Sequence, residues 1–294
     1  MAAKTTETFS ARRKQFATRL KTVEKKPTTK LILLIIANTK DPDIGKGCRQ
    51  DIRSIRQMFK KLSVHMQFPF VEFVVMGKDY SRQNVQLAMD AVKPDDNDVV
   101  VVYYTGHGFS FKKDKEKRYP QVDLRPPFSP NKISVINENT QNLADLFEAV
   151  KAKGARLNIV IGDCCNNRIQ FTRNFKGGDE NVRARKRPRM VINKEMCETL
   201  FCDYTASILV AAADKGQFAV SDDKLGSIFT FTFTNNLKTL MNKSVDRSNA
   251  LPWTKLLEET KKETLVLSKT YEVEDGKQGN QKAIFDIQSK KFLY

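Results

Sequence analysis

The chain has 294 residues, enough for one large domain, and 40% of them are hydrophobic, which permits a packed core. The longest apolar run, Leu31–Ala37, has the length of a strand and is too short to span a bilayer. The net charge of +17 suggests a nucleic-acid-binding protein, but 13 of these charges fall in residues 1–30 and 172–194. The rest of the chain is nearly balanced, and aromatic residues are not interleaved with the basic runs as in a base-stacking surface. We therefore expect no nucleic-acid partner and no membrane partner.

Five cysteines and two histidines limit the redox and metal chemistry of the chain. Cys164 and Cys165 are adjacent, which does not suit two separate disulfides, and the sequence has no CxxC pair. Because His65 and His107 are the only histidines, a structural zinc site is not expected. These features favour a reduced protein of the cytoplasm. The alternative of an exported protein, whose signal peptide was removed before residue 1, stays open.

Residues 1–29 are polar and basic, and we interpret them as an arm in front of one domain over residues 30–294. In this domain, apolar runs of strand length alternate with apolar residues at helical spacing. The expected strands are Leu31–Ala37, Val71–Val75, Asp98–Tyr104, Leu157–Ile161, Ser207–Ala213 and Ala283–Ile287. The expected helices are Cys48–Leu62, Ser81–Val92 with Ser81 as N-cap, Thr140–Val150, Ser227–Met241 and Trp253–Leu267.

Strands that are apolar on both faces and separated by helices indicate a parallel sheet that is covered on both sides. The sequence therefore predicts an α/β fold of three layers, with a mostly parallel central sheet and helices on both faces. Residues 242–294 are expected to form the C-terminal part of the same domain. Two irregular stretches, 110–131 and 172–193, interrupt the pattern, and long loops in a compact domain are usually functional or disordered.

Two of the expected strands end in reactive side chains. The third ends in Tyr-Tyr-Thr-Gly-His-Gly and carries His107, and the fourth ends in Gly-Asp-Cys-Cys and carries Cys165. Ligands of open α/β sheets bind beyond the carboxyl ends of the strands. A histidine beside a cysteine activates the thiol as a nucleophile, whereas each residue alone is most often a solvated histidine or a buried thiol. We expect the N–H groups of Gly108 and Cys165 to form an oxyanion hole.

The two blocks together resemble those of caspases and metacaspases. YYTGHG is similar to the histidine block of this family, and IVIGDCC is similar to the metacaspase block in which Asp-x-Cys follows an apolar strand. GKGCRQDI at 45–52 resembles the metacaspase Gly-Cys-x-x-Asp block, and residues 211–233 resemble the strand and helix that follow the nucleophile. The resemblance covers roughly residues 30–290. It implies a caspase-like fold and a cysteine endopeptidase with His107 and Cys165 as its catalytic dyad.

The resemblance also implies a substrate preference. In metacaspases, acids at the positions of Asp51 and Asp163 line a pocket for a basic P1 side chain, the residue before the cleaved bond. Two carboxylates in a partly closed pocket attract a cation, and arginine can be held by two hydrogen bonds. We therefore expect protein or peptide substrates with Arg or Lys at P1. The alternatives are that Asp51 is an ordinary acid in the first turn of a helix and that Asp163 accepts hydrogen bonds in a loop.

Calcium activates many metacaspases through a cluster of acids, one of which follows the nucleophile by a few residues. Here the stretch after Cys165 reads NNRIQFTR and contains no acid, and Asn166 stands where the family often has histidine. We therefore expect no cofactor and no metal.

The stretch 172–194 is expected to be a processing loop, because related caspase-like enzymes are often cut in the corresponding linker. The candidate cleavage sites are Arg183, Arg185 and Lys186. Arg187 is a poor site because Pro188 follows it and restricts the preceding backbone. The alternative is a solvated run of charge without a role in processing.

Two other functions remain open from the sequence. The first is an inactive caspase-like scaffold that binds protein partners, against which the intact His–Cys pair argues. The second is a basic nucleic-acid-binding protein, which would retain DNA in a salt-dependent way through its folded core.

Overall fold

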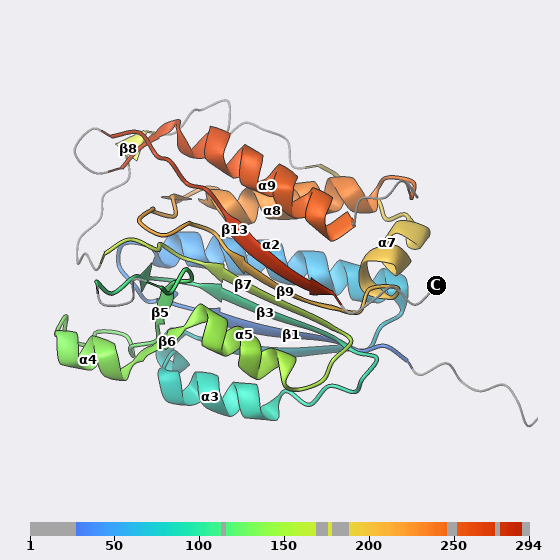
Figure 1. Cartoon of the computed structure of the whole chain (residues 1–294), viewed down its shortest axis with the longest axis horizontal. Coiled ribbons are helices and arrows are strands. Elements are labelled where there is room, and N and C mark those ends of the chain that lie inside the picture. Colours follow the sequence, from blue (N-terminus) through green and yellow to red (C-terminus); the bar gives the residue numbers. More distant parts are fainter. Residues whose placement is uncertain are drawn as a thin grey trace, which may run out of the picture.

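A computed structural model describes residues 28–112, 116–168, 176–177, 188–245, 252–273 and 277–289. Its centre is a six-stranded sheet in the order β13-β9-β7-β3-β1-β2 (Figure 1). Within it, β13 runs antiparallel to β9, and all other neighbouring pairs are parallel. The strands are β1 (Leu31–Ala37), β2 (Phe70–Met76), β3 (Val99–Thr105), β7 (Leu157–Asp163), β9 (Ala206–Ala211) and β13 (Ile284–Ser289). The predicted mostly parallel sheet is confirmed.

Helices cover both faces of the sheet (Figure 1). One face carries α2 (Gly45–Met66), α7 (Lys194–Phe201), α8 (Ile228–Met241) and α9 (Pro252–Ser268). The other carries α3 (Arg82–Ala91) and α5 (Leu143–Lys151). Successive side chains of β1 enter the two apolar cores in turn, so that Leu33 packs with α2 and Leu34 packs toward α3. This two-sided burial explains why β1 is apolar at every position.

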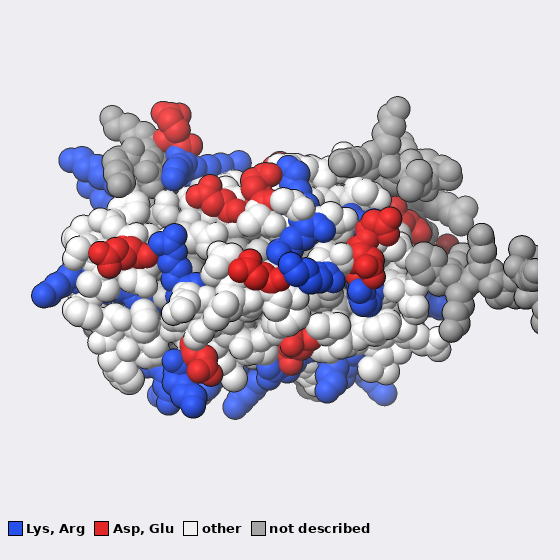
Figure 2. Space-filling view, turned by 90° about the horizontal axis from the view of Figure 1, so that it is seen from below, with Lys and Arg blue, Asp and Glu red and all other residues white. Residues whose placement is uncertain are grey.

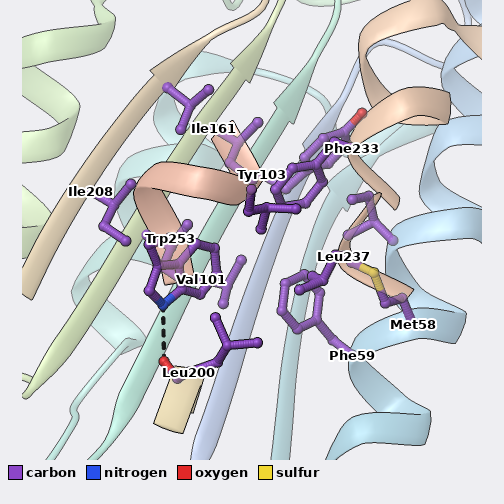
Figure 3. Packing of buried hydrophobic residues seen from close by; sticks show 14 of the residues in the cluster. Met58, Phe59, Val101, Tyr103, Ile161, Leu200, Ile208, Phe233, Leu237 and Trp253 are labelled. Atoms are coloured by element: carbon purple, nitrogen blue, oxygen red, sulfur yellow. Dashed lines mark hydrogen bonds between the residues drawn. The ribbon is translucent and has the colours of Figure 1, made fainter. Parts of the chain in front are cut away.

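The larger core lies between the sheet and helices α2, α7, α8 and α9 (Figure 3). Trp253 of α9 is fully buried there, and its indole Nε1 donates a hydrogen bond of 2.9 Å to the carbonyl of Leu200. Its ring also packs edge-on against Phe201, with centroids 5.6 Å apart. Trp253 therefore joins α9 to α7, and its truncation to alanine would cost about 3–5 kcal/mol of stability.

All five predicted helices are present, but α2 is longer than the predicted Cys48–Leu62 at both ends, and α7 was not predicted. Ser81 caps α3, where its side chain accepts the N–H of Asn84. Residues 228–234, IFTFTFT, alternate like a strand in sequence but form the start of α8, as the helix prediction had it. The predicted helix over 140–150 was wrong in its first three residues, which form strand β6 (Thr140–Asn142). The reason is that Asn142 caps α5 through its side chain, and the polar residues before it pair with another strand.

The stretch 110–131, predicted to be irregular, contains a strand. β5 (Gln121–Asp123) joins β4 (Gly108–Phe109) and β6 in a small antiparallel sheet, and α4 (Ile133–Glu138) follows. This sheet and α4 lie at the carboxyl end of the central strands (Figure 1). The remaining short elements are η1 (Gly77–Asp79), β8 (Lys176–Gly177), β10 (Ser221–Asp222), β11 (Gly226–Ser227) and β12 (Tyr271–Glu272).

The face of the molecule seen from the side of α3 and α5 carries charges of both signs (Figure 2). Lysines and arginines are interspersed there with aspartates and glutamates, so this face does not present a patch of one sign. Among the residues that the structure describes, no helix combines the length and the apolar character needed to cross a membrane. The predicted N-terminal arm over residues 1–29 lies almost entirely outside the described residues.

Candidate active site

The register of β3 and β7 brings the two predicted catalytic residues to the same edge of the sheet. Thr105 of β3 is paired with Asp163 of β7. His107 and Cys165 each follow these paired residues by two positions, so both leave the sheet side by side. Their side chains line one common cavity at the carboxyl ends of the strands.

The Cys165 side chain is largely enclosed, with 4% of the residue exposed. Its Sγ accepts a hydrogen bond of 3.1 Å from the N–H of Ala219, which belongs to the loop between β9 and β10. Cys164 also borders the cavity, but it is buried in the apolar core between the sheet and helices α3 and α5. The structure therefore places Cys164 as a packing residue and Cys165 at the lining of the cavity beside His107.

The His107 ring is held by a carboxylate from a third strand end. Its Nε2 lies 2.8 Å from Oδ2 of Asp41, which follows β1 by four residues. The other oxygen of Asp41 accepts the N–H groups of Asp43 and Ile44 at the start of α2. Burial raises the pKa of Asp41, but the hydrogen bond and charge of His107 and these two N–H groups outweigh it, and the pKa is lowered. Asp41 is therefore a charged partner for His107.

Asp41 was not among the predicted site residues. With Nε2 bonded to Asp41, Nδ1 is the ring nitrogen that remains to face a thiol. The order of the strands, β7-β3-β1, sets Cys165, His107 and Asp41 in a row along the sheet edge. The acid-rich run after the first strand, KDPDIG, is the signal that sequence reasoning left unused.

Buried tyrosines fix the backbone that carries His107. Tyr104 donates a hydrogen bond of 2.6 Å to the carbonyl of His107, and the N–H of Asp123 donates to the same carbonyl at 3.0 Å. Tyr80 lies 3.2 Å from Tyr104 and donates to the carbonyl of Asp123. Burial raises the pKa of both tyrosines well above the usual value, so they stay neutral donors. Successive side chains of a strand point to opposite faces, so Tyr103 turns to the other side of β3.

Gly108 brings its backbone into contact with the two cysteines. A Cβ at this position would lie 2.4 Å from Sγ of Cys164 and 2.5 Å from the carbonyl oxygen of Cys165. Only glycine fits such an approach. The backbone of Gly108 therefore lies close to that of Cys165. The N–H groups of these two residues are the ones predicted to form an oxyanion hole.

The two predicted specificity residues lie together at the floor of the same cavity. Asp51 of α2 and Asp163 of β7 are 1% and 3% exposed, and both bind the hairpin of β10 and β11. Asp51 accepts the N–H of Ser227 at 2.8 Å and the hydroxyl of Thr105 at 3.1 Å. Asp163 accepts the hydroxyls of Ser227 and Thr230. Asp51 lies beyond the first turn of α2 and Asp163 is the last residue of β7, and both buried carboxylates accept hydrogen bonds at the cavity.

Burial raises the pKa of Asp163 to about 6, although hydrogen bonds from Thr230 and Ser227 oppose the shift. Tyr103 points toward the same carboxylate, with its hydroxyl 2.6 Å from that of Thr230 and 3.5 Å from Oδ2 of Asp163. A second carboxylate beside Asp163, that of Asp51, gives the cavity an acidic floor that a cation would neutralise.

The cavity is small, at about 30 Å³. This is the space of about one water molecule, and a lysine or arginine side chain needs far more. Its outer wall is Ala219, Val220 and Ser221. Ser221 packs on the backbone of Gly47 in α2, where a Cβ would lie 2.3 Å from its hydroxyl. The hairpin thus sits close against the start of α2 and covers the acidic floor.

This geometry agrees with the comparison of the chain with protein families, in which the caspase domain matches residues 30–282. The chain belongs to the caspase-domain family. It is thus a member of a family of cysteine peptidases. No curated protein sequence matches it significantly.

Solved structures share the fold. One is the crystal structure of a Geobacter sulfurreducens protein, which is 13% identical and superposes with a TM-score of 0.52. The match covers 89% of this chain and 94% of that protein. At this identity the likeness shows the caspase-like arrangement of the sheet and helices, and nothing about activity.

Two further predictions concern metals and processing. Among the described residues, no group of three or more His, Cys, Asp or Glu side chains is placed to hold a metal ion. Asn166, the residue after Cys165, stands at the position where the family often has histidine. It is buried, and its side-chain N–H donates a hydrogen bond to the carbonyl of Arg118. The candidate processing residues Arg183, Arg185 and Lys186 lie outside the described residues.

Proposed function

We propose that this caspase-domain protein is a cysteine endopeptidase of the metacaspase type that cuts after Arg or Lys, with His107 and Cys165 as its dyad. The observation that carries the proposal is the shared cavity, which joins a thiol, an imidazole and two buried carboxylates. A thiol and an imidazole supply nucleophilic chemistry, and the carboxylates supply a site for a cationic side chain.

The chemistry begins when Nδ1 of His107 takes the proton of the Cys165 thiol and Sγ attacks the carbonyl carbon of the scissile bond. The carbonyl oxygen becomes an oxyanion, which the N–H groups of Gly108 and Cys165 stabilise. His107 then gives its proton to the amide nitrogen as the C–N bond breaks, which releases the amine product and leaves a thioester. Asp41 stabilises the imidazolium that carries this proton between the two steps.

Water completes the cycle. It attacks the thioester carbon while His107 accepts one of its protons, and the C–S bond then breaks as Cys165 regains a proton. The products are a peptide with a new carboxyl terminus and the free enzyme. No cofactor or metal enters this sequence, and the acid-free stretch after Cys165 supports a calcium-independent enzyme.

Specificity for a basic P1 side chain follows from the floor of the cavity. A guanidinium or ammonium group placed between Asp51 and Asp163 would neutralise two buried carboxylates. Because the cavity holds about 30 Å³, the loop of Ala219–Ser221 must move outward when a substrate enters. That movement also breaks the hydrogen bond from Ala219 to Sγ of Cys165, so the substrate frees the nucleophile.

The second candidate function is an inactive scaffold that binds protein partners. The test that separates the two is mass-spectrometric mapping of a peptidyl inhibitor that carries Arg at P1 and an electrophile that alkylates thiols. The peptidase proposal predicts stoichiometric labelling of Cys165, with Cys48, Cys164, Cys197 and Cys202 unmodified. Labelling must also fall sharply when Asp163→Asn removes one carboxylate of the pocket. In a scaffold, labelling would be slow and would follow the solvent exposure of each cysteine. Cys202, the one cysteine that is not fully buried, would then be labelled first.

A further inference from the structure

A second, larger cavity borders His107 on the side away from the acidic floor. It has a volume of about 260 Å³, and its wall includes His107, Gly108 and Asp41. Neither Asp51, Asp163 nor Cys165 belongs to it. His107 thus lies between two cavities, one of which is lined by the nucleophile Cys165.

The position of the histidine decides which part of a peptide would reach this second cavity. In the proposed reaction, His107 gives its proton to the amide nitrogen of the leaving group. That nitrogen belongs to the residue after the cleaved bond, P1′, so this residue must lie on the histidine side of the nucleophile. The cavity beyond His107 is therefore where the P1′ side chain points.

The lining of the cavity indicates the chemistry of that side chain. Its apolar residues are Pro42, Phe109, Pro126, Pro127, Phe128 and Ile136. Asp41 and Asp123, which also line it, are engaged by His107 and Arg125. The remaining charges, Lys40 and Asp43, have opposite signs. An uncharged side chain suits this lining, and a cavity of about 150 Å³ is already enough for a benzene ring.

Phe128 is the most unusual residue of this wall. It is 91% exposed, and its φ of 66° lies in the left-handed region, which is costly for a bulky side chain. Arg125 anchors the loop by pairing with Asp123 at 2.6 Å and by binding the carbonyl of Pro130 at 3.2 Å. A large aromatic ring held in a strained backbone at the mouth of a cavity is typical of a ligand clamp.

We propose that this cavity is the P1′ subsite and that Phe128 stacks on an aromatic P1′ side chain of the substrate. The inference rests on the peptidase function proposed above. Aromatic pairs favour edge-on or offset contacts, and such a contact together with burial of the ring favours Phe at P1′ over Gly by about tenfold in kcat/KM.

The test uses two internally quenched peptides that share Arg at P1 and differ only in Phe or Gly at P1′, together with an arylamide that has Arg at P1 and no P1′ residue. In the wild type, kcat/KM for the Phe peptide is expected to exceed that for the Gly peptide about tenfold, and Phe128→Ala should bring the ratio to about one. Phe128→Tyr keeps the ring and should keep the ratio. Leu87→Ala removes an exposed apolar side chain of α3 and is the matched control.

The outcomes separate this subsite from the peptidase function itself. A wild type that cuts the arylamide and both peptides at equal rates overturns the subsite, and so does an unchanged ratio in Phe128→Ala. A wild type that cuts none of the three substrates overturns the peptidase function and the subsite with it. Should Phe128→Ala fold poorly, Phe128→Asn provides the second variant, because asparagine tolerates the left-handed backbone. In this variant, too, the preference for the Phe peptide over the Gly peptide must disappear.

Discussion

Nε2 of His107 and Oδ2 of Asp41 lie 2.8 Å apart, so the imidazole is bonded to the carboxylate through one of its two ring nitrogens. In this position the carboxylate selects the tautomer in which Nδ1 is free to accept a proton, and it stabilises the imidazolium once the proton has moved. The pair turns the expected dyad into a row of three groups supplied by three neighbouring strands.

Asp41→Asn tests this relationship. The amide can turn its NH₂ group toward Nε2, which then must accept, and the proton would move to Nδ1, where it blocks the thiol. We expect kcat to fall by about 100-fold or more with little change in KM. The pH dependence of kcat should also shift, which loss of packing alone would not cause. Asp90→Asn, an exposed change on α3, is the matched control. An Asp41→Asn enzyme with an unaltered kcat and pH profile would remove Asp41 from the catalytic machinery.

The neighbouring cysteines give a second prediction. Cys165→Ala is expected to abolish cleavage, because it removes the nucleophile, and His107→Ala should do the same by removing the base. Cys164→Ala takes a small side chain out of the core and should retain most activity with a stability loss of about 1 kcal/mol. Activity assays and thermal melts of the three variants check this. If Cys164 were essential and Cys165 dispensable, the assignment of the nucleophile would be wrong by one residue.

The raised pKa of Asp163 predicts a pH-dependent affinity. Burial raises the pKa of this carboxyl to about 6, so it gains its charge at a higher pH than an exposed aspartate does. An arginine amide should therefore bind more tightly as the pH rises through 6. The measurement is calorimetry on the double variant His107→Ala, Cys165→Ala, which removes both the charge of the histidine and the reaction. Adding Asp163→Asn should flatten the dependence; an affinity that does not change between pH 5 and 7 would contradict the assignment.

The same shift has a consequence for stability. Because the folded pKa of Asp163 lies above its unfolded value, the folded state holds this proton more tightly. The contribution of Asp163 to the free energy of unfolding should therefore fall as the pH rises from about 4 to about 6. Urea titrations of the wild type and of Asp163→Asn across this range measure this contribution. The free energy of unfolding should fall more steeply with rising pH in the wild type than in the variant.

Self-processing gives a further prediction. If the loop of residues 172–194 is a substrate of the enzyme, purified wild type should yield fragments of about 20 and 12 kDa from the 33.6 kDa chain, helped by the high effective concentration of a tethered segment. Cys165→Ala should stay intact. Sequencing the amino terminus of the smaller fragment would show whether the cut follows Arg183, Arg185 or Lys186. A wild type that is fully active as a single chain would exclude this activation step.

Much of the fold could be predicted from the sequence because the central strands are buried on both faces. β1 was predicted with its bounds correct, since every residue from Leu31 to Ala37 is apolar. The strand β5 was missed because it is three residues long and lies in a proline-rich stretch. Its pairing with β4 and β6 depends on contacts that are distant in the sequence, which local patterns do not encode.

The candidate site could likewise be predicted only in part. His107 and Cys165 could be predicted because each follows a strong strand in a recognisable block, and the strand register then sets them together. The acids of the KDPDIG run could have been noticed, but the sequence does not show that Asp41 is the one that reaches His107, because the loop after β1 determines where its carboxylate points. The small size of the acidic cavity could not be predicted from the sequence either, because the hairpin beside it packs on α2 through Ser221 and Gly47, which are far apart along the chain.

The most direct test of the central claim is the cleavage of two peptides that differ only at P1, one with Arg and one with Asp, by the wild type and by Cys165→Ala. The account predicts that the wild type cuts after Arg, that it leaves the Asp peptide intact, and that Cys165→Ala cuts neither. Preferred cleavage after Asp, or cleavage after Arg that survives the loss of Cys165, would contradict it.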